Sequence, residues 1–241
     1  MLVEQAPLSG LTPVSERRVL RDDVYESVLT LLLNGDVTAG SRLSIEKIAR
    51  HLHVSPTPVR EALVQLERTG LVTREALKGY RVAPPPDQRQ LEELFEARLM
   101  LETAATRAAS PGTESLLAEL REAHRAHELA GDRLIEAMDE GRNDPARVAD
   151  FFYRDADFHS VVFKHSNNRY LIGMHDTLGA QLHRMRQTID RGVSDVRESV
   201  AEHLAVLKAF ESGDLDSPVQ MMRAHIEQAR ARSLKEAGNA A

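Results

Sequence analysis

Four side chains in the second half of the chain have the types and the spacing of a metal site. Asp155 and His159 are four residues apart on a predicted helix, so both lie on one face of it. His203 and His225 lie on two predicted helices joined by a turn near residue 214, and each is 11 residues from that position. An antiparallel pair of helices therefore brings the two histidines to the same height, roughly 16 Å from the turn.

One carboxylate and three imidazoles suit a borderline divalent cation such as Zn²⁺, Ni²⁺, Co²⁺ or Mn²⁺. The four groups converge if the helix that carries Asp155 and His159 packs against the other two helices. Four protein ligands around a six-coordinate ion leave positions for water or for a small carboxylate. We therefore expect one divalent transition metal ion per chain, held by Asp155, His159, His203 and His225.

Other histidines and acids of this half do not need the same explanation. The chain has ten histidines, so some coincidences of spacing are expected. Asp157 competes with Asp155, but its offset of two residues from His159 turns its side chain away from that face. We expect surface or core positions for the other histidines here, which are His124, His127, His165, His175 and His183.

The run SPTPVREALVQLERTG, residues 55–70, is predicted to form a helix that reads DNA. Proline is tolerated in a first helical turn because the N–H groups there have no partner within the helix. Ser55 is then a candidate N-cap. Val59, Leu63 and Leu66 follow at helical spacing and form a stripe that we expect to be buried.

The neighbouring elements complete a winged helix-turn-helix. The run SIEKIARHL predicts a shorter helix before it, and two short strands are predicted around a turn at Lys78 and Gly79. Such a unit inserts the N-terminal end of its second helix into the major groove. Thr57 can then reach a phosphate, and Arg60 can donate two hydrogen bonds to a guanine edge. Alternatively, Arg60 and Glu61 are ordinary solvent-facing charges.

The composition excludes several classes of protein. Hydrophobic residues at 42 % and charged residues at 28 % are typical of a globular protein. The absence of cysteine excludes disulfides, thiolate metal ligands and cysteine nucleophiles. No apolar run approaches the ~18 residues that span a bilayer, and the N-terminus lacks the basic start and apolar core of a signal peptide. We therefore expect a cytoplasmic protein with no membrane partner.

The net charge of −6 is concentrated in the second part of the chain. Residues 1–83 hold 11 Lys and Arg against 10 Asp and Glu, whereas residues 84–241 hold 20 against 27. A DNA-binding unit needs a local basic face rather than a basic chain. The overall negative charge is therefore compatible with DNA binding by the first part.

The run APPPD, residues 83–87, marks the clearest boundary, because consecutive prolines favour extended backbone and cannot continue a helix. The expected fold class is mainly α, with an N-terminal winged helix-turn-helix domain and a C-terminal all-α bundle of about six helices. We expect a flexible arm at 1–15, the DNA-binding domain at 16–83, a proline linker at 84–87, the helical domain at 88–236 and a tail at 237–241. Breaks in the pattern predict bundle helices at about 87–109, 113–140, 145–166, 168–190, 194–212 and 215–236.

Residues 19–83 resemble the DNA-binding domain of the GntR family of bacterial transcription regulators. The likeness rests on LSIEKIARHLHVSPTPVREALVQLERTGLV followed by KGYRV, in which Gly79 matches the glycine at the wing tip. The family usually has an arginine between the serine and the threonine of this run, and here the residue is Pro56. Base reading is therefore expected to depend more on Arg60. The residues expected at the DNA interface are Ser55, Thr57, Arg60, Lys78 and Gly79.

Residues 88–234 resemble the FCD domain, the all-helical effector domain of one GntR branch. In its metal-containing members an aspartate and three histidines are the ligands, and they correspond here to Asp155, His159, His203 and His225. The run FEARLMLETAATRAA resembles the first helix of that domain. The resemblance implies that Arg98 points into the effector cavity and holds an anionic group. Alternatively, Arg98 forms a surface ion pair with Glu102, four residues away.

These observations indicate a metabolite-responsive transcription regulator, which we expect to act as a repressor. A homodimer would present two recognition helices to a palindromic operator. The metal and Arg98 would bind a small carboxylate, and the effect would pass through the linker at Pro84–Pro86.

Two other classes of function remain open on the sequence. A metal-dependent hydrolase would use the ion to activate water, but no general base stands beside it at a recognisable spacing. Glu202 is adjacent to His203 and is expected to face elsewhere on its helix. A bundle that uses metal only for stability is the third possibility.

Overall fold

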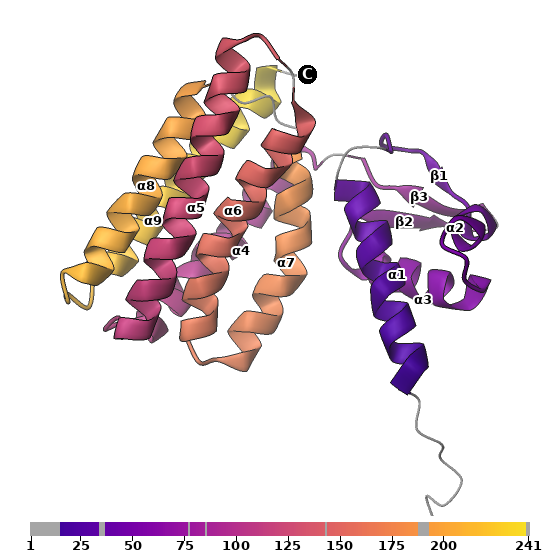
Figure 1. Ribbon diagram of the computed structural model, residues 1–241, viewed down its shortest axis with the longest axis horizontal. Coiled ribbons are helices and arrows are strands. Elements are labelled where there is room, and N and C mark those ends of the chain that lie inside the picture. Colours follow the sequence, from indigo (N-terminus) through magenta and orange to yellow (C-terminus); the bar gives the residue numbers. More distant parts are fainter. Residues whose placement is uncertain are drawn as a thin grey trace, which may run out of the picture.

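The chain folds into a small N-terminal part that contains a sheet and a larger C-terminal bundle of helices (Figure 1). The computed structural model describes residues 15–33, 37–76, 78–84, 86–142, 144–187 and 193–239. Most of the expected arm (residues 1–14) and the last two residues of the expected tail (240–241) lie outside the described residues. Among the helices of the described part, none is long and apolar enough to cross a membrane.

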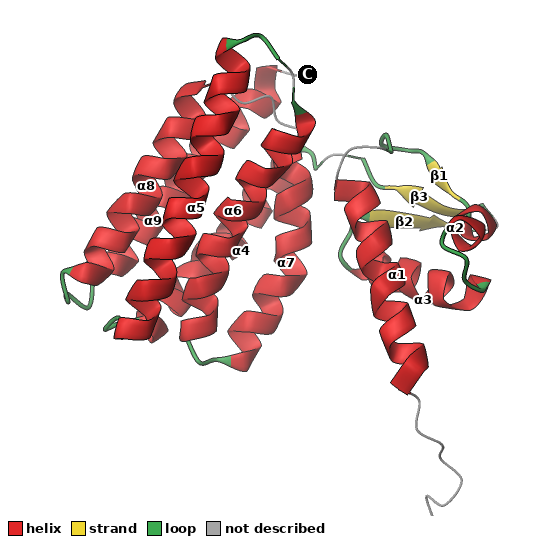
Figure 2. Ribbon diagram, viewed as in Figure 1, coloured by secondary structure: helices red, strands yellow, loops and turns green. Residues whose placement is uncertain are grey.

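The N-terminal part combines helices with an antiparallel sheet (Figure 2). Its described elements are α1 (Ser15–Leu33), β1 (Arg42–Leu43), α2 (Ile45–His51), α3 (Pro56–Arg68), β2 (Val72–Glu75) and β3 (Gly79–Val82). The strand order is β1-β3-β2, and the hairpin of β2 and β3 is the wing. β1 was not predicted, because two residues are too few to show an alternating pattern.

A fully buried stripe holds α3 in place. Val59, Ala62, Leu63 and Leu66 have no exposed surface, in agreement with their helical spacing. They belong to one apolar cluster with residues of α1 and β2. This packing turns the opposite side of α3 to solvent and so determines which of its side chains are accessible.

The C-terminal part is a bundle of long helices with no strand among its described residues. Its elements are α4 (Gln88–Ala109), α5 (Glu114–Asp139), α6 (Pro145–His165), α7 (Arg169–Gln187), α8 (Val193–Glu211) and α9 (Ser217–Asn239). The predicted fold class is thereby confirmed. α9 runs on into the range that the sequence predicts as a tail.

The helices of the bundle pack around a common interior. α4 packs against α6, α7 and α9, while α5 packs against α6 and α8, and α8 packs against α9. Buried aromatic rings fill much of the space between them, among them Phe95, Phe158 and Phe210. Polar side chains that point into this interior are thus removed from water and need partners there.

Both ends of the linker are tied to secondary structure. Asp87 caps α4, because its side chain accepts a hydrogen bond from the N–H of Gln90 at 2.8 Å and its own N–H donates to the Gln90 side chain at 3.0 Å. On the other side, the N–H of Ala83 donates to the carbonyl of Leu71 at 3.0 Å. A second connection between the two parts is the contact of α1 with α7, which stand next to each other in Figure 1.

Candidate metal centre and nucleic-acid interface

The bundle brings together the four residues that the sequence predicts as metal ligands. Asp155 and His159 come from α6, His203 from α8 and His225 from α9. One donor atom from each lies within 4.8 Å of the donor atoms of the others. All four residues are at most 5 % exposed. The rings of His203 and His225, placed at one height by the hairpin of α8 and α9, have centroids 4.6 Å apart.

The distances within this cluster fit a set of ligands around one ion. Nε2 of His159 lies 3.2 Å from Nε2 of His203 and 3.3 Å from Nε2 of His225. Oδ1 of Asp155 lies 3.5 Å from Nε2 of His203. Two ligands that are each ~2.1 Å from one ion stand roughly 3.0 Å apart at an octahedral angle and roughly 3.4 Å apart at a tetrahedral one. The three separations are therefore those expected around a single small cation.

Partners outside the cluster orient the imidazoles toward it. Nδ1 of His159 lies 2.5 Å from Glu102, and Nδ1 of His225 lies 2.8 Å from Glu202. A carboxylate accepts the Nδ1 proton and leaves the lone pair of Nε2 facing the middle of the cluster. Lone pairs that face one another repel, and a shared cation removes that repulsion. The donor set therefore fits a divalent metal ion.

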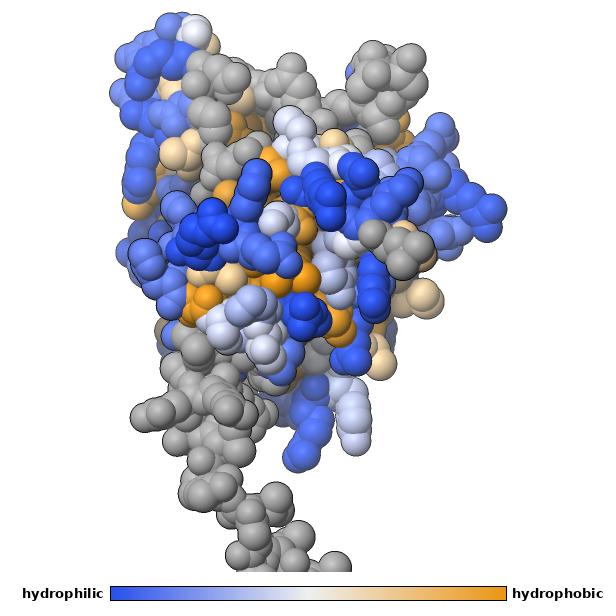
Figure 3. Space-filling view, turned by 90° about the vertical axis from the view of Figure 1, so that its right-hand side faces the viewer, coloured by the Kyte–Doolittle hydropathy of each residue, from blue (hydrophilic) through white to orange (hydrophobic). Residues whose placement is uncertain are grey.

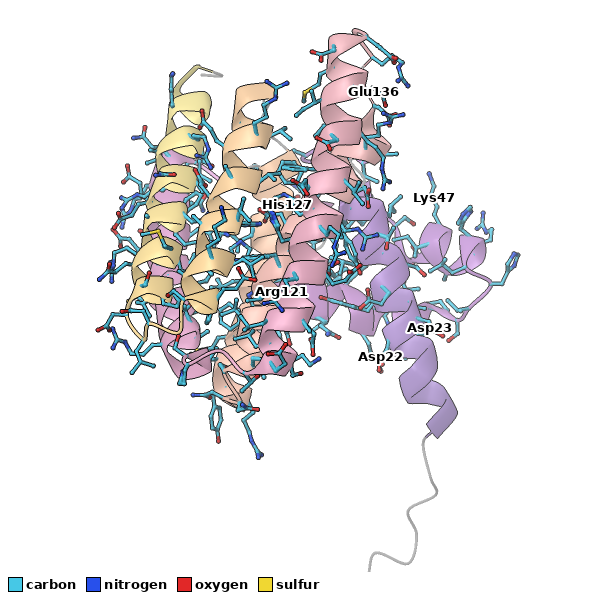
Figure 4. All side chains as sticks on the ribbon, turned by 60° about the vertical axis from the view of Figure 1, so that its left-hand side comes forward. Asp22, Asp23, Lys47, Arg121, His127 and Glu136 are labelled. Atoms are coloured by element: carbon cyan, nitrogen blue, oxygen red, sulfur yellow. The ribbon has the colours of Figure 1, made fainter. Side chains whose placement is uncertain are left out.

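The third imidazole has a different partner. Nδ1 of His203 lies 3.0 Å from Nδ1 of His127, a buried residue of α5 that Figure 4 shows pointing into the bundle. The ring of His203 also stacks on Phe158, with centroids 4.2 Å apart. Burial lowers the pKa of His203 well below its ordinary value, and it also lowers the pKa of His225. Both imidazoles are thus held neutral, the form that binds metal.

Arg98 lies beside the cluster and is buried rather than exposed. Its Nε donates to Glu102 at 2.5 Å, and its Nη2 lies 2.9 Å from Nε2 of His159. The ion pair with Glu102 exists, but the alternative that places it on the surface is wrong, because both side chains are 3 % exposed. Burial alone would raise the pKa of Glu102, but Arg98 and His159 lower it far below its ordinary value. An anionic group that reached this place would meet a guanidinium and the cluster together.

Glu202 lies closer to the cluster than the sequence suggests. It contacts His225 from the outer side, and Arg232 donates to both of its oxygens at 2.5 and 2.9 Å. Burial alone would raise the pKa of Glu202, but hydrogen bonds from His225 and Arg232 lower it. Arg232 also pairs with Asp195 and Glu198. Glu202 is thus held by His225 and Arg232, and it is not free to act as a base.

Apart from His127, the described residues expected to be uninvolved are not part of the cluster. Asp157 pairs with Arg154 at 3.4 Å and is not part of the cluster. His165 lies 3.3 Å from Glu119, and His175 stacks on Phe163. His124 is buried. The side chain of His183 is outside the described residues.

The start of α3 differs from an ordinary helix start because of its prolines. Ser55 has the backbone conformation of an N-cap, but its side chain makes no capping hydrogen bond. An N-cap side chain accepts from the N–H of the second or third helical residue. Here Pro58, the third residue, has no N–H, so only Thr57 could donate. The Ser55 hydroxyl is exposed and remains available to a partner outside the chain.

The other predicted DNA contacts of α3 point outward from the same turn. Thr57 and Arg60 are exposed, whereas Val59 between them is buried. Glu46 of α2 is close enough for Arg42 and Arg60 to contribute to its lowered pKa, after larger contributions from its own backbone N–H and from Ser44. Figure 3 views the molecule from the side of α2 and β1, where hydrophilic side chains cover much of the surface.

The wing carries the remaining two predicted contacts. Gly79 has φ +87°, a conformation that a side chain would strain, and no atom lies within 4 Å of where its Cβ would be. Lys78 is exposed and pairs with Glu75 at 3.7 Å, and Arg81 pairs with the same carboxylate at 3.1 Å. Arg74, which was not predicted, lies over the Tyr80 ring at 6.0 Å and is a further exposed cation of the wing.

The sequence reasoning missed the supporting residues of the cluster. Glu102 was considered only as a surface partner of Arg98, and His127 was expected to be uninvolved. Lys47 is an exposed cation at the start of α2 (Figure 4), and its N–H donates to the hydroxyl of the capping residue Ser44 at 3.2 Å.

Two family models match the chain. The model "Bacterial regulatory proteins, gntR family" matches residues 20–82. The model "FCD domain" matches residues 93–228, more than half of the 241-residue chain. The first match covers the winged part, and the second covers the cluster and Arg98.

Proteins similar to the whole chain are regulators by name. The HTH-type transcriptional regulator BphR of Paraburkholderia xenovorans (strain LB400) is 25 % identical over 217 residues, which cover 89 % of this chain and 85 % of that protein. The HTH-type transcriptional repressor RspR of Escherichia coli (strain K12) is 24 % identical over 226 residues, which cover 93 % and 90 %.

Solved structures share the fold. The Escherichia coli protein McbR/YncC has a TM-score of 0.73 at 22 % identity, covering 90 % of this chain and 97 % of that one. A putative GntR transcriptional regulator from Rhodococcus sp. RHA1 has a TM-score of 0.73 at 21 % identity, covering 89 % and 97 %. At these identities the likeness concerns the fold.

Proposed function

The chain belongs to the gntR family of bacterial regulatory proteins and carries an FCD domain, and on this premise we propose a repressor whose operator binding is controlled by a small carboxylate at a divalent metal ion. DNA binding and transcription regulation come with the family. The metal, the carboxylate and the repression are our proposal. The observation that carries it is the convergence of three Nε2 atoms and one carboxylate next to a buried arginine.

The residues around the cluster have separate roles in this proposal. Asp155, His159, His203 and His225 hold one ion per chain. A divalent ion held there supplies coordination positions that a carboxylate oxygen can take. Arg98 donates hydrogen bonds to the carboxylate, and Glu102 keeps both Arg98 and His159 in position. Charge-assisted bonds of this kind favour an anionic ligand over a neutral one.

The N-terminal part supplies the other half of the function. We assign phosphate contacts to Ser55 and Thr57, base reading to Arg60, and wing contacts to Lys78 and Gly79. A homodimer would place two copies of α3 on a palindromic operator. We propose that the DNA-binding part spans residues 16–83 and the effector-binding part residues 88–236, with the linker at 84–87 between them.

Regulation requires that the carboxylate bind two arrangements of the protein with different affinity. The linker is anchored at Ala83 on one side and at Asp87 on the other. A shift of α4 around the ligand would therefore be passed to the DNA-binding part with little slack. The hydrolase alternative has no support, since the relatives named above are regulators and Glu202 is held by His225 and Arg232.

The test measures metal content, binding of an organic acid and binding of DNA on one preparation of the protein. We expect about one divalent ion per chain by elemental analysis and clearly less in His225→Ala. We expect DNA from upstream of the gene to be retarded, and an organic acid found by thermal-shift screening to change that affinity only when metal is present. Arg60→Ala should weaken specific binding by about 1–3 kcal/mol.

Three results would count against the proposal. Equal metal content in His225→Ala would remove the metal site. A rise in melting temperature with metal but no response to any acid would favour a purely structural ion. Turnover of candidate acids or esters that is lost in His203→Ala would favour the hydrolase.

A further inference from the structure

Arg98 contacts a proposed metal ligand at the atom that would bind the ion. Its Nη2 lies 2.9 Å from Nε2 of His159, and both residues are at most 3 % exposed. A guanidinium can only donate hydrogen bonds, so Nε2 of His159 is the acceptor here. The proton of this imidazole is then on Nδ1, where the carboxylate of Glu102 accepts it at 2.5 Å. The lone pair of Nε2 is therefore used by Arg98.

A lone pair on Nε2 cannot serve a hydrogen bond and a metal ion at the same time. Metal ions bind neutral imidazole through this lone pair, so an ion at His159 requires Arg98 to give up the contact. The hydrogen bond is charge-assisted and lies in the interior, where such bonds are strong. An ion must also approach the positive charge of Arg98 at short range, with little water to screen the repulsion. Arg98 therefore opposes binding of an ion on its own.

The buried surroundings of Arg98 make the loss of this contact costly. Its Nε donates to Glu102 at 2.5 Å, so this carboxylate already serves both Arg98 and His159. A charged donor that is left without an acceptor in the interior changes an equilibrium constant by roughly tenfold or more. A carboxylate that reaches the site offers a new acceptor, since one of its oxygens can face the ion while the other accepts from Nη2 of Arg98.

Arg232 has the same relation to another proposed ligand, with one difference. It donates to both oxygens of Glu202 at 2.5 and 2.9 Å, and Glu202 lies 2.8 Å from Nδ1 of His225. Arg98 and Arg232 thus each hold a carboxylate that contacts the Nδ1 atom of an imidazole. The described contacts of Arg232 are all with carboxylates, those of Asp195, Glu198 and Glu202, whereas Arg98 also reaches the metal-binding nitrogen of a ligand.

We propose that Arg98 competes with the metal ion for His159, and that a small carboxylate ends this competition by giving Arg98 another acceptor. The proposal rests on the metal site and the carboxylate proposed above, and it adds how the two ligands depend on each other. The ion alone is held more weakly than its four ligands would allow, and the acid alone meets an arginine that is already paired. Each therefore increases the affinity for the other by the same factor.

The experiment measures the affinity of the full-length chain for Co²⁺ by titration against a competing chelator, with and without acetate as the small carboxylate. In the wild type, acetate should raise the affinity about tenfold or more, the factor for one charge-assisted hydrogen bond. Acetamide, which has the shape of acetate without its charge, should leave it unchanged. Arg98→Met should bind Co²⁺ about tenfold or more tightly than the wild type without acetate, and the same concentration of acetate should add little.

Two further variants separate the contact with Nε2 from the loss of a positive charge. Arg232→Met removes the same charge but no donor to a ligand nitrogen, so its affinity for Co²⁺ should equal that of the wild type or fall below it. Arg98→Lys keeps a charge beside Glu102, but its ammonium ends one bond short of the place of Nη2. It should also bind Co²⁺ more tightly than the wild type, and it decides the question if Arg98→Met does not fold.

The possible failures are distinguishable. Affinities in the Arg98 variants that are equal to or below the wild-type value would make Arg98 a support of the site, and they would overturn this proposal while leaving the metal site intact. An equal gain in Arg232→Met would assign the effect to overall charge and would overturn it as well. A wild-type chain that takes up no Co²⁺ would overturn the metal site and this proposal together.

Discussion

The imidazoles of the cluster are held by partners from three helices. Glu102 of α4 contacts His159, His127 of α5 contacts His203, and Glu202 contacts His225. Each partner contacts its ring at Nδ1, and loss of an outer partner of this kind typically costs about 10–100-fold in metal affinity. A substitution outside the four proposed ligands is therefore expected to have a measurable effect.

Glu102→Gln tests this support. The amide keeps the shape of the side chain but removes the charge that holds Arg98 and the Nδ1 proton of His159. We expect the affinity for Co²⁺ to fall by about 10–100-fold, measured by titration against a competing chelator. Glu96→Gln, at an exposed position of the same helix, is the matched control and should bind like the wild type. Equal affinity in both variants would contradict the role of Glu102.

The stability of the metal-free chain should depend on pH through the buried histidines. Burial lowers the pKa values of His203 and His225 in the folded chain, whereas in the unfolded chain they return to about 6.5. Below about pH 6.5 the unfolded chain binds more protons, so the free energy of unfolding decreases as the pH falls. Thermal melts with chelator should show a lower melting temperature at about pH 5.5 than at about pH 7.5. A constant or rising value would be incompatible with neutral buried rings.

Among the residues of the cluster, the sequence predicts those whose positions are determined by a single helix or a single hairpin. Asp155 and His159 share a face because of the helical period, and the turn near residue 214 equalises the heights of His203 and His225. Glu102 and His127 reach the cluster only through packing of α4 and α5 against other helices. No local spacing encodes that packing, so these residues could not be found in the same way.

The recognition helix is the element where local chemistry departs most from a typical pattern. Its capping residue makes no capping hydrogen bond, and Pro58 removes one of the two N–H groups that could donate one. The sequence predicts Ser55 as the N-cap. It does not predict the absence of the capping hydrogen bond, because that depends on which N–H groups lie within reach of the Ser55 hydroxyl. The short strand β1 was missed for the opposite reason, since its pairing with β3 is long-range and it has too few residues to show a period.

Pro56→Arg tests how the helix meets DNA. Pro56 is exposed in the first turn of α3, so an arginine there adds a cation without disturbing the core. We expect tighter binding to the upstream DNA and a salt dependence steeper by about 0.9 in the log–log slope, which corresponds to one more phosphate contact. Ala118→Arg on α5, also exposed, adds the same charge far from α3. A slope that changes equally in both variants would mean that only overall charge matters.

At the scale of the whole molecule, the described residues include two connections between the bundle and the DNA-binding part. One is the anchored linker at residues 84–86, and the other is the contact between α1 and α7. The linker follows directly from the sequence, because prolines stiffen it. The contact between α1 and α7 joins helices far apart in the chain, and the sequence gives no sign of it.

Replacing both Pro84 and Pro86 by glycine separates the two connections. A flexible linker transmits little of a shift in α4, so the effect of the acid on DNA affinity should drop from a typical coupling of about fivefold or more toward none. Binding of Co²⁺ and binding of DNA without acid should stay as in the wild type. Mobility-shift titrations with and without acid measure this. If the acid changes DNA affinity as much as in the wild type, its effect is transmitted through the contact between α1 and α7.

The central strand of the sheet, β3, joins the wing tip to the start of the linker. β3 begins at Gly79, the wing tip, and ends at Val82, one residue before the anchor at Ala83. The tip and the start of the linker are thus the two ends of one strand, roughly 13 Å long at 3.3 Å per residue. The linker therefore continues directly from the strand whose other end is the wing tip. A displacement of the linker would act on the wing through this strand, and a displacement of α7 would act on α3 through α1.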